Sequence, residues 1–264
     1  MEGFKAFIGL SGLFYIGGVA GWVLELFFRR FFSQKRWVNP GFLTGPFLPL
    51  YGFGIVGFYV FANFIPFSSL PLPEWASTLI CVLSAGIGMT VIEYVAGLIF
   101  IKGLKVKLWD YSKRPGNIQG IICPLFSFFW LAIGAIYVYL LNPAFVAVFD
   151  FFVDNFGIFG FAFGLFYGIL FVDFGWSLGL LTKIRKLVSD SRLVVSWENI
   201  KTSFQDHYAR LEEKSPWIFA FKTKKEEFSA LLNEYLLALK EKSALRVEEE
   251  RHKAKIRKEK RKKD

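Results

Sequence analysis

The chain of 264 residues contains only two histidines and two cysteines. Both histidines, His207 and His252, lie in the hydrophilic C-terminal part of the sequence. Both cysteines, Cys81 and Cys123, lie in apolar runs, where a thiol is most simply a small apolar residue. The sequence also lacks a P-loop for ATP, a zinc-protease helix motif and a hydrolase nucleophile elbow. We therefore predict no catalytic residue, no metal site and no cofactor, and we expect that the chain is not an enzyme.

Charge is scarce in the first two-thirds of the chain. Residues 1–182 hold 10 Lys and Arg and 8 Asp and Glu, whereas residues 183–264 hold 22 Lys and Arg and 14 Asp and Glu. Apolar residues make up 54% of the whole chain, with 33 Phe and 8 Trp, which is more than a water-soluble domain of this size needs. We predict a transmembrane helical domain over residues 1–182 and a basic cytoplasmic tail with amphipathic helices over residues 183–264.

Five stretches are apolar for long enough to cross the hydrocarbon core, which takes about 20 helical residues. Each must be helical because lipid offers no partner for backbone N–H and C=O groups. The predicted fold class is all-α: a polytopic membrane protein of about five transmembrane helices with a helical or disordered cytoplasmic tail. The predicted spans are residues 4–28, 47–67, 76–101, 121–141 and 156–181.

The positive charges of the first part cluster in two loops, which follow the first and the third predicted span. Cytoplasmic loops of membrane proteins are enriched in Lys and Arg. The alternate connections carry Glu74, Asp150 and Asp154 instead. We predict a multi-pass protein of the cytoplasmic membrane, with its N-terminus outside and its C-terminus in the cytoplasm.

Three acidic residues, Glu25, Glu93 and Asp173, lie within spans or at their ends. A carboxylate in hydrocarbon costs at least ~2.5 kcal/mol, so each should face the interior of the bundle. Glu25 precedes Arg29 by one helical turn, which places both on one helix face. Glu93 and Asp173 lie deeper, at one depth, where they could share a proton, hold a cation or receive a basic group. Alternatively, each is neutral, or hydrogen-bonded to a Trp, Tyr or Asn of a neighbouring span, and fixes helix register.

The first four spans resemble two copies of one hairpin. The segments Asn39–Pro46 and Asn117–Pro124 each place a Pro seven residues after an Asn, at the start of a span, as a turn before a helix requires. Convergent loop chemistry is the alternative to duplication. The Gly- and Pro-rich run 39–54 predicts broken backbone, which protein or water must cover. The predicted residues of a substrate path are Glu25, Glu93, Asp173, Asn39, Pro40, Gly41, Asn117 and Gln119.

The two basic loops predict a cationic rim on the cytoplasmic side. Anionic lipid headgroups or an anionic substrate would bind such a rim, whereas the alternative is that the charges only set the topology. The predicted residues of the rim are Arg29, Arg30, Arg36, Lys113 and Arg114.

Apolar residues of the tail recur at helical spacing. The stripe that begins Trp197, Ile200 and Phe204 predicts a helix capped by Ser196, and a second stripe occupies residues 228–239. Residues beyond Glu248 are nearly all charged and are expected to fray or to be disordered. The basic end suits the anionic inner leaflet better than nucleic acid, and we expect no nucleic-acid partner. A merely solvated tail is the alternative.

Several distinctive motifs lie within residues 10–135: Gly21–Glu25, Val38–Pro46 with Tyr51-Gly52, Glu93–Gly97, Leu108–Ser112 and Asn117–Gly120. Together these motifs resemble a bacterial family of ABC-transporter permeases that is called CmpB-like or type IV. The resemblance implies a permease subunit in the cytoplasmic membrane that works with a separate ATPase, and the missing P-loop is consistent with that. Five spans are few for a permease, which suggests a homo-oligomer.

Two other functions fit the sequence. The chain could be a non-transport membrane protein that binds anionic lipids or organises partners through its basic cytoplasmic face. It could also be a carrier without an ATPase, coupled to protons or cations through Glu93 and Asp173.

Overall fold

The computed structural model describes residues 2–188, 194–210, 230–239 and 241, and these residues are predominantly helical. Five helical segments are long and apolar enough to cross a membrane, which confirms the predicted fold class. These segments are Gly3–Ser33, Pro49–Ser69, Glu74–Gly103, Pro124–Asp154 and Phe156–Lys186. The elements are α1 (Glu2–Phe28), η1 (Arg29–Ser33), α2 (Pro49–Asn63), η2 (Phe67–Ser69), α3 (Glu74–Leu98), η3 (Ile99–Gly103), β1 (Val106–Lys107), α4 (Pro124–Ile136), η4 (Tyr137–Leu141), α5 (Asn142–Asp154), α6 (Phe156–Val188), β2 (Val195–Ser196) and α7 (Trp197–Arg210).

The fourth span extends well beyond the predicted residues 121–141. The helix α4, the π-turn η4 and the helix α5 follow one another without a break and form one segment of 31 residues. Pro143 does not end this segment, and it lies directly after the π-turn, among the first residues of α5, where proline is tolerated best. The helix α2 begins at Pro49, two residues after the predicted start of the second span at residue 47.

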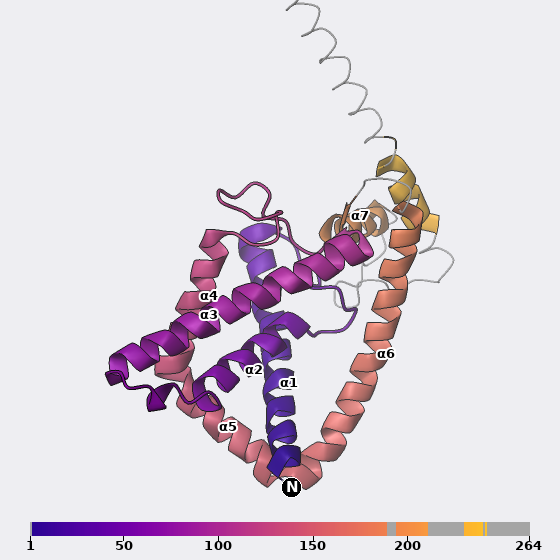
Figure 1. Cartoon of the computed structure of the whole chain (residues 1–264). Coiled ribbons are helices and arrows are strands. Elements are labelled where there is room, and N and C mark those ends of the chain that lie inside the picture. Colours follow the sequence, from indigo (N-terminus) through magenta and orange to yellow (C-terminus); the bar gives the residue numbers. More distant parts are fainter. Residues whose placement is uncertain (1, 189–193, 211–229, 240, 242–264) are drawn as a thin grey trace, which may run out of the picture.

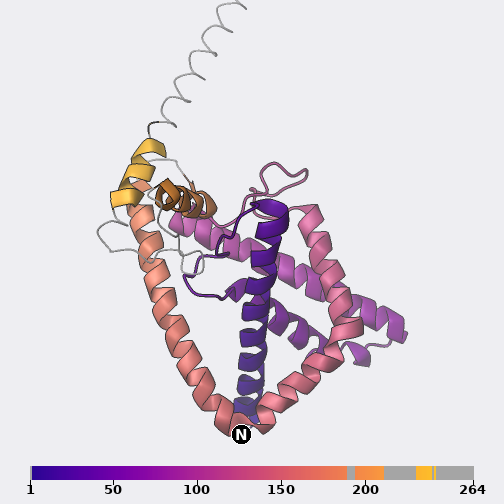
Figure 2. The ribbon, with the colours of Figure 1, turned by 180° about the vertical axis from the view of Figure 1, so that it is seen from behind.

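The helix α1 stands in the middle of the bundle (Figure 1). It packs against α2 and α5 on one side and against α6 on the other, while α3 packs against α2 and α4. Seen from behind, α6 again lies on the opposite side of α1 from α4 (Figure 2). Glycines let the start of the second span approach α1 closely. A Cβ on Gly18 would lie 2.1 Å from the ring of Phe47, and one on Gly21 would lie 2.3 Å from Tyr51.

The helix α6 touches the rest of the bundle along one narrow face. Phe163 and Leu181 on that face are buried, whereas Phe161 and Val172 on the opposite side are 81% and 74% exposed. Such large apolar side chains suit contact with hydrocarbon rather than with water. The exposed surface of α6 therefore agrees with a span that borders lipid.

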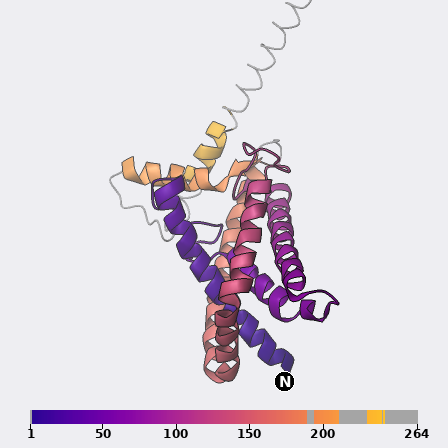
Figure 3. The same ribbon diagram turned by 90° about the vertical axis from the view of Figure 1, so that its left-hand side faces the viewer.

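The described part of the tail is packed against the membrane domain. α7 lies across the ends of the spans (Figure 3), and the strand β2 before it pairs in parallel with β1. One hydrophobic cluster joins α7 and the segment 230–239 to the end of α6 and to the loop before α2. The predicted boundary after residue 182 falls inside α6, which continues to Val188. This cluster includes Phe42, Leu43, Leu181, Ile184, Trp197, Ile200, Phe204 and Leu232.

Candidate functional site

The loop before α2, residues 34–48, is organised by the buried amide of Asn39. The indole Nε1 of Trp22 donates to Asn39 Oδ1 at 2.7 Å. The Asn39 amide nitrogen donates to the carbonyl oxygens of Leu43 and Thr44 at 3.2 and 2.9 Å. Gly41 takes a left-handed backbone conformation, with φ of +72°, which glycine adopts without a steric penalty. Residues 39–48 have the irregular backbone that the sequence predicted, whereas residues 49–54 of the predicted run are helical because α2 begins at Pro49. We call residues 34–48 the first loop.

Asp173 of α6 holds the first loop from the other side. Its carboxylate accepts hydrogen bonds from the backbone N–H of Thr44 at 3.1 Å and of Gly45 at 2.9 Å. The hydroxyl groups of Thr44 and Ser177 donate to it as well. Four donors satisfy this carboxylate, and none of them comes from Glu93. The structure therefore does not bring Glu93 and Asp173 into contact, although both were predicted at one depth.

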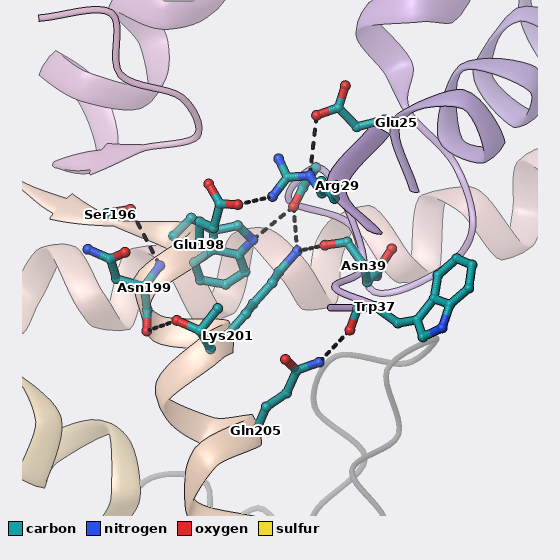
Figure 4. Close-up of polar contacts among 12 residues, drawn as sticks. Glu25, Arg29, Trp37, Asn39, Ser196, Glu198, Asn199, Lys201 and Gln205 are labelled. Carbon is teal, nitrogen blue, oxygen red and sulfur yellow. Dashed lines mark hydrogen bonds and ion pairs between the residues drawn. The ribbon is translucent and has the colours of Figure 1, made fainter. Parts of the chain in front are cut away.

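Lys201 of α7 binds the same loop from the tail (Figure 4). Its side chain is only 4% exposed, and its amine donates to the carbonyl oxygens of Asn39 at 2.7 Å and Gly41 at 2.6 Å. Trp197 also donates to the carbonyl oxygen of Gly41, at 3.0 Å. Burial, together with the nearby charge of Arg29, holds the pKa of Lys201 well below its usual range.

Glu25 of α1 is neutralised within its own helix. Arg29 Nε lies 3.2 Å from Glu25 Oε1, as their spacing predicted, and the hydroxyl of Tyr51 donates to Glu25 Oε2 at 3.1 Å. The other end of the Arg29 guanidinium lies 2.6 Å from Glu198 of α7. Arg29 therefore links the first span to the tail (Figure 4).

Glu93 of α3 lies in a different environment. It is 3% exposed and accepts two hydrogen bonds, from the hydroxyl of Tyr111 at 3.0 Å and from Nε1 of Trp130 at 2.9 Å. This arrangement agrees with the second interpretation of the sequence, in which each acid is hydrogen-bonded to a Trp, Tyr or Asn. The rings of Trp130 and Tyr51 lie 6.5 Å apart, so aromatic side chains separate Glu93 from Glu25.

The loop before α4, residues 105–123, begins with β1, which pairs with β2 of the tail, and we call it the second loop. Its own side chains hold much of the remainder. Asp110 accepts from the backbone N–H of Ser112 at 2.9 Å and pairs with Lys107 at 3.0 Å. Burial alone would raise the pKa of Asp110, but the hydrogen bonds from Ser112 and Lys107 hold it below its usual value.

The aromatic residues of the second loop tie it to α3 and α4. Trp109 Nε1 donates to the carbonyl oxygen of Ile121 at 2.8 Å, and the ring of Tyr111 stacks on Phe126 with centroids 4.2 Å apart. Burial and the neighbouring Glu93 carboxylate raise the pKa of Tyr111, so its hydroxyl keeps its proton and acts as a donor.

The remaining residues predicted for a substrate path occupy both loops. Asn117 accepts from the backbone N–H of Gly120 at 2.9 Å, and Gln119 donates to the hydroxyl of Tyr94 at 3.0 Å. Pro40 is buried beside Asn39. Pro40 therefore belongs to the packed first loop, whereas Gln119 is exposed on the second.

Most of the predicted cationic rim is used in contacts within the chain. Arg29 pairs with Glu198, and Arg36 pairs with Asp206 at 2.7 Å. Arg30 lies over the ring of Trp37 and donates to the carbonyl oxygen of Lys35. Lys113 and Arg114 are exposed on the second loop. Arg29 and Arg36 thus serve to dock the tail.

Five residues with central roles in this site were not predicted as site residues: Trp22, Tyr51, Tyr111, Trp130 and Lys201. The sequence gave only a weak indication that the four aromatic residues belong to the site, since Trp and Tyr in or near a span are often only interface anchors. Lys201 stands one helical turn after Trp197, on the apolar stripe of α7. A lysine is unusual on an apolar stripe. It was the one local signal that this face of α7 contacts polar groups, which are the carbonyl groups of the first loop.

The two hairpins share details that the sequence did not reveal. Each first helix ends in a π-turn, Arg29–Ser33 or Ile99–Gly103. Each π-turn is followed by a lysine in the left-handed conformation, Lys35 with φ of +57° or Lys105 with φ of +59°. Each hairpin also binds its glutamate with an aromatic donor from the second helix. These parallels add support to the duplication.

Comparison with known proteins gives one match. The family model described as "Putative ABC-transporter type IV" matches residues 12–178, which include both loops and all three intramembrane acids. No curated protein and no solved structure matches the chain. No group of three or more His, Cys, Asp or Glu that could hold a metal ion occurs in the part of the chain that the structure describes.

Proposed function

The chain belongs to the putative ABC-transporter type IV family, and on that premise we propose that it is the permease subunit of an ABC transporter. We further propose that it lies in the cytoplasmic membrane and works with a separate ATPase. The family match carries this proposal because it covers nearly the whole membrane domain. The five apolar spans support it, since a substrate path across a bilayer needs such helices.

We propose that a substrate path runs between the two hairpins, close to Glu25 and Glu93. Its support is the position of these acids, whose aromatic partners Tyr51 and Trp130 face each other across the hairpins. Polar groups inside a membrane domain are costly and commonly mark a path for substrates or ions. Asn117 and Gln119 would border the path on the second loop, whereas Asp173, Asn39, Pro40 and Gly41 would set the shape of the first loop.

The partner is tested by gentle extraction of the full-length, tagged chain from its native membrane. We expect a second polypeptide with a P-loop to co-purify and the complex to hydrolyse ATP. We also expect Glu93→Gln to keep the partner but to change the hydrolysis that accompanies transport. If the folded chain never brings down an ATP-hydrolysing protein under a range of mild detergents, the proposal fails.

We propose that the N-terminus lies outside and the C-terminus in the cytoplasm, as the basic loops predicted. The test replaces Cys81 and Cys123 by Ser and then compares two single cysteines at exposed positions, Ser68→Cys and Lys113→Cys. A membrane-impermeant thiol reagent applied to intact cells should label only the first variant. Labelling of the second variant alone would reverse the topology.

We also propose that the chain acts as a homo-oligomer, because five spans are few for a permease. Mass measurement of the detergent-solubilised protein decides this point. A purely monomeric permease that still transports with its ATPase would contradict it.

A further inference from the structure

The three acids in the spans differ in how their charge is compensated. Glu25 lies 3.2 Å from Arg29. Asp173 accepts from four donors, including two backbone N–H groups. Glu93 accepts from only two neutral donors, Tyr111 and Trp130, and within the described residues no Lys, Arg or His lies at ion-pairing distance from it. Among the residues that the structure describes, neither Glu93 nor Asp173 has a positive partner, but Glu93 is buried and accepts from only half as many donors as Asp173.

Burial makes this lack of a partner important. Glu93 is 3% exposed, and an ionised carboxylate in such a place is costly unless a cation or a proton compensates it. The two hydrogen bonds act in the other direction because they favour the charged form. The other titratable groups around it are Tyr111, Tyr51 of α2 and, beyond Tyr51, Glu25 with its partner Arg29. The buried carboxyl group is thus held by two hydrogen bonds without a compensating positive charge.

We propose that Glu93 binds and releases one proton and that Tyr111 transmits this change to the second loop. Water supplies the proton from the cytoplasmic end of the second loop and takes it back, so that no other group changes its charge. The added O–H of Glu93 needs an acceptor. Trp130 cannot accept because an indole N–H is only a donor, but the hydroxyl oxygen of Tyr111 can.

Tyr111 is well placed to move the second loop. Its hydroxyl contacts Glu93, while its backbone N–H donates to the carbonyl oxygen of Gly120 at 2.8 Å. It adjoins the exposed residues 112–116. When Tyr111 changes from donor to acceptor, its hydroxyl hydrogen turns away from Glu93 and loses that acceptor. The contact that holds the loop segment attached to the Tyr111 backbone therefore changes. This inference goes beyond the permease proposal and does not depend on an ATPase.

The test is infrared difference spectroscopy of the full-length protein in lipid nanodiscs, between mildly alkaline and mildly acidic pH. We expect a carbonyl band of a protonated carboxyl group to appear on acidification. This band should be lost in Glu93→Gln and retained in Glu25→Gln, which changes the matching acid of the first hairpin. If the wild-type bands persist unchanged in folded Glu93→Gln, the proposal is overturned.

A second variant keeps the test decisive if Glu93→Gln does not fold. Tyr111→Phe removes one donor to the ionised carboxylate, so the midpoint at which the band appears should move to higher pH. The Tyr94→Phe variant alters the neighbouring tyrosine, which contacts Gln119 instead, and should leave the midpoint in place. An unchanged midpoint in folded Tyr111→Phe would contradict the role of Tyr111 and of its bond to Glu93.

Discussion

The two hairpins have the same plan but fix their loops by different means. In both, the first helix carries a glutamate, ends in a π-turn and is followed by a left-handed lysine. The first loop is then held from outside the hairpin, by Asp173 of α6 and by Lys201 of α7. The start of the second loop pairs with β2 of the tail. Beyond β1, this loop relies on its own side chains and on contacts with α3 and α4, among them that of Tyr111 with Glu93.

This difference separates a fixed loop from a loop that can respond. Contacts from two distant helices determine the first loop whatever the state of its glutamate, whose charge Arg29 already balances. Beyond β1, no contact from α6 or α7 like those on the first loop is found among the described residues of the second loop, and one of its contacts is a hydrogen bond to a buried acid without a positive partner. Of two similar hairpins, one can thus serve as a structural support while the other is able to change its conformation during function.

The largest effect is expected when the support of the first loop is removed at Asp173. Asp173→Ala leaves the N–H groups of Thr44 and Gly45 without an acceptor, which should cost about 3 kcal/mol. A thermal melt of the detergent-solubilised protein measures the loss. Asp150→Asn is the control, because Asp150 is exposed on α5. Equal melting of the Asp173 variant and the wild type would show that this contact does not hold the loop.

Lys201→Met should have a smaller effect of about 2 kcal/mol, because it removes two hydrogen bonds to buried carbonyl groups but keeps the apolar stem of the side chain. The same melt detects it, and proteolysis at the first loop should become faster. Lys183→Met changes an exposed lysine of α6 and should have no such effect. If both variants behave alike, the tail does not support the first loop.

Close packing between α1 and the start of α2 should show an intermediate effect. Gly21→Ala places a methyl group 2.3 Å from Tyr51, which should cost about 1.5 kcal/mol through overpacking. Gly160→Ala on α6 is the matched control, since a Cβ there meets nothing within 4 Å. A stability loss in the control as large as in Gly21→Ala would argue against the close approach of α2.

The smallest effect is expected for the exposed pair of Arg36 and Asp206. Both side chains are about half exposed, at 46% and 55%, and such pairs contribute roughly 0.5 kcal/mol or less. Arg36→Ala should therefore leave the melting temperature nearly unchanged at physiological salt. A drop similar to that of Lys201→Met would mean that the tail is docked mainly by charge.

The sequence was sufficient for the features that depend on local pattern. Hydropathy predicted five spans, and the Gly- and Pro-rich run predicted irregular backbone before α2. Helical spacing predicted the pair of Glu25 and Arg29 and a helix from Trp197. Each of these follows from residues close together in the chain.

The sequence was insufficient where partners lie far apart in the chain. Asp173 binds a loop 128 or 129 residues before it, and Lys201 binds carbonyl groups 160 and 162 residues before it. Backbone N–H and C=O groups have no side-chain signature, so the residues that bind them cannot be matched by type. The continuation of the fourth span was missed because Asn142-Pro143 is typical of both a turn and a helix start.

Hydrogen exchange of the two loops tests the difference between them most directly. It is measured in nanodiscs at one pH for the wild type and for Glu93→Gln, in which the amide imitates the protonated acid. Exchange should increase in residues 108–122 and remain unchanged in residues 37–48. An equal increase in both loops, or an increase confined to residues 37–48, would contradict a fixed first loop and a responsive second loop.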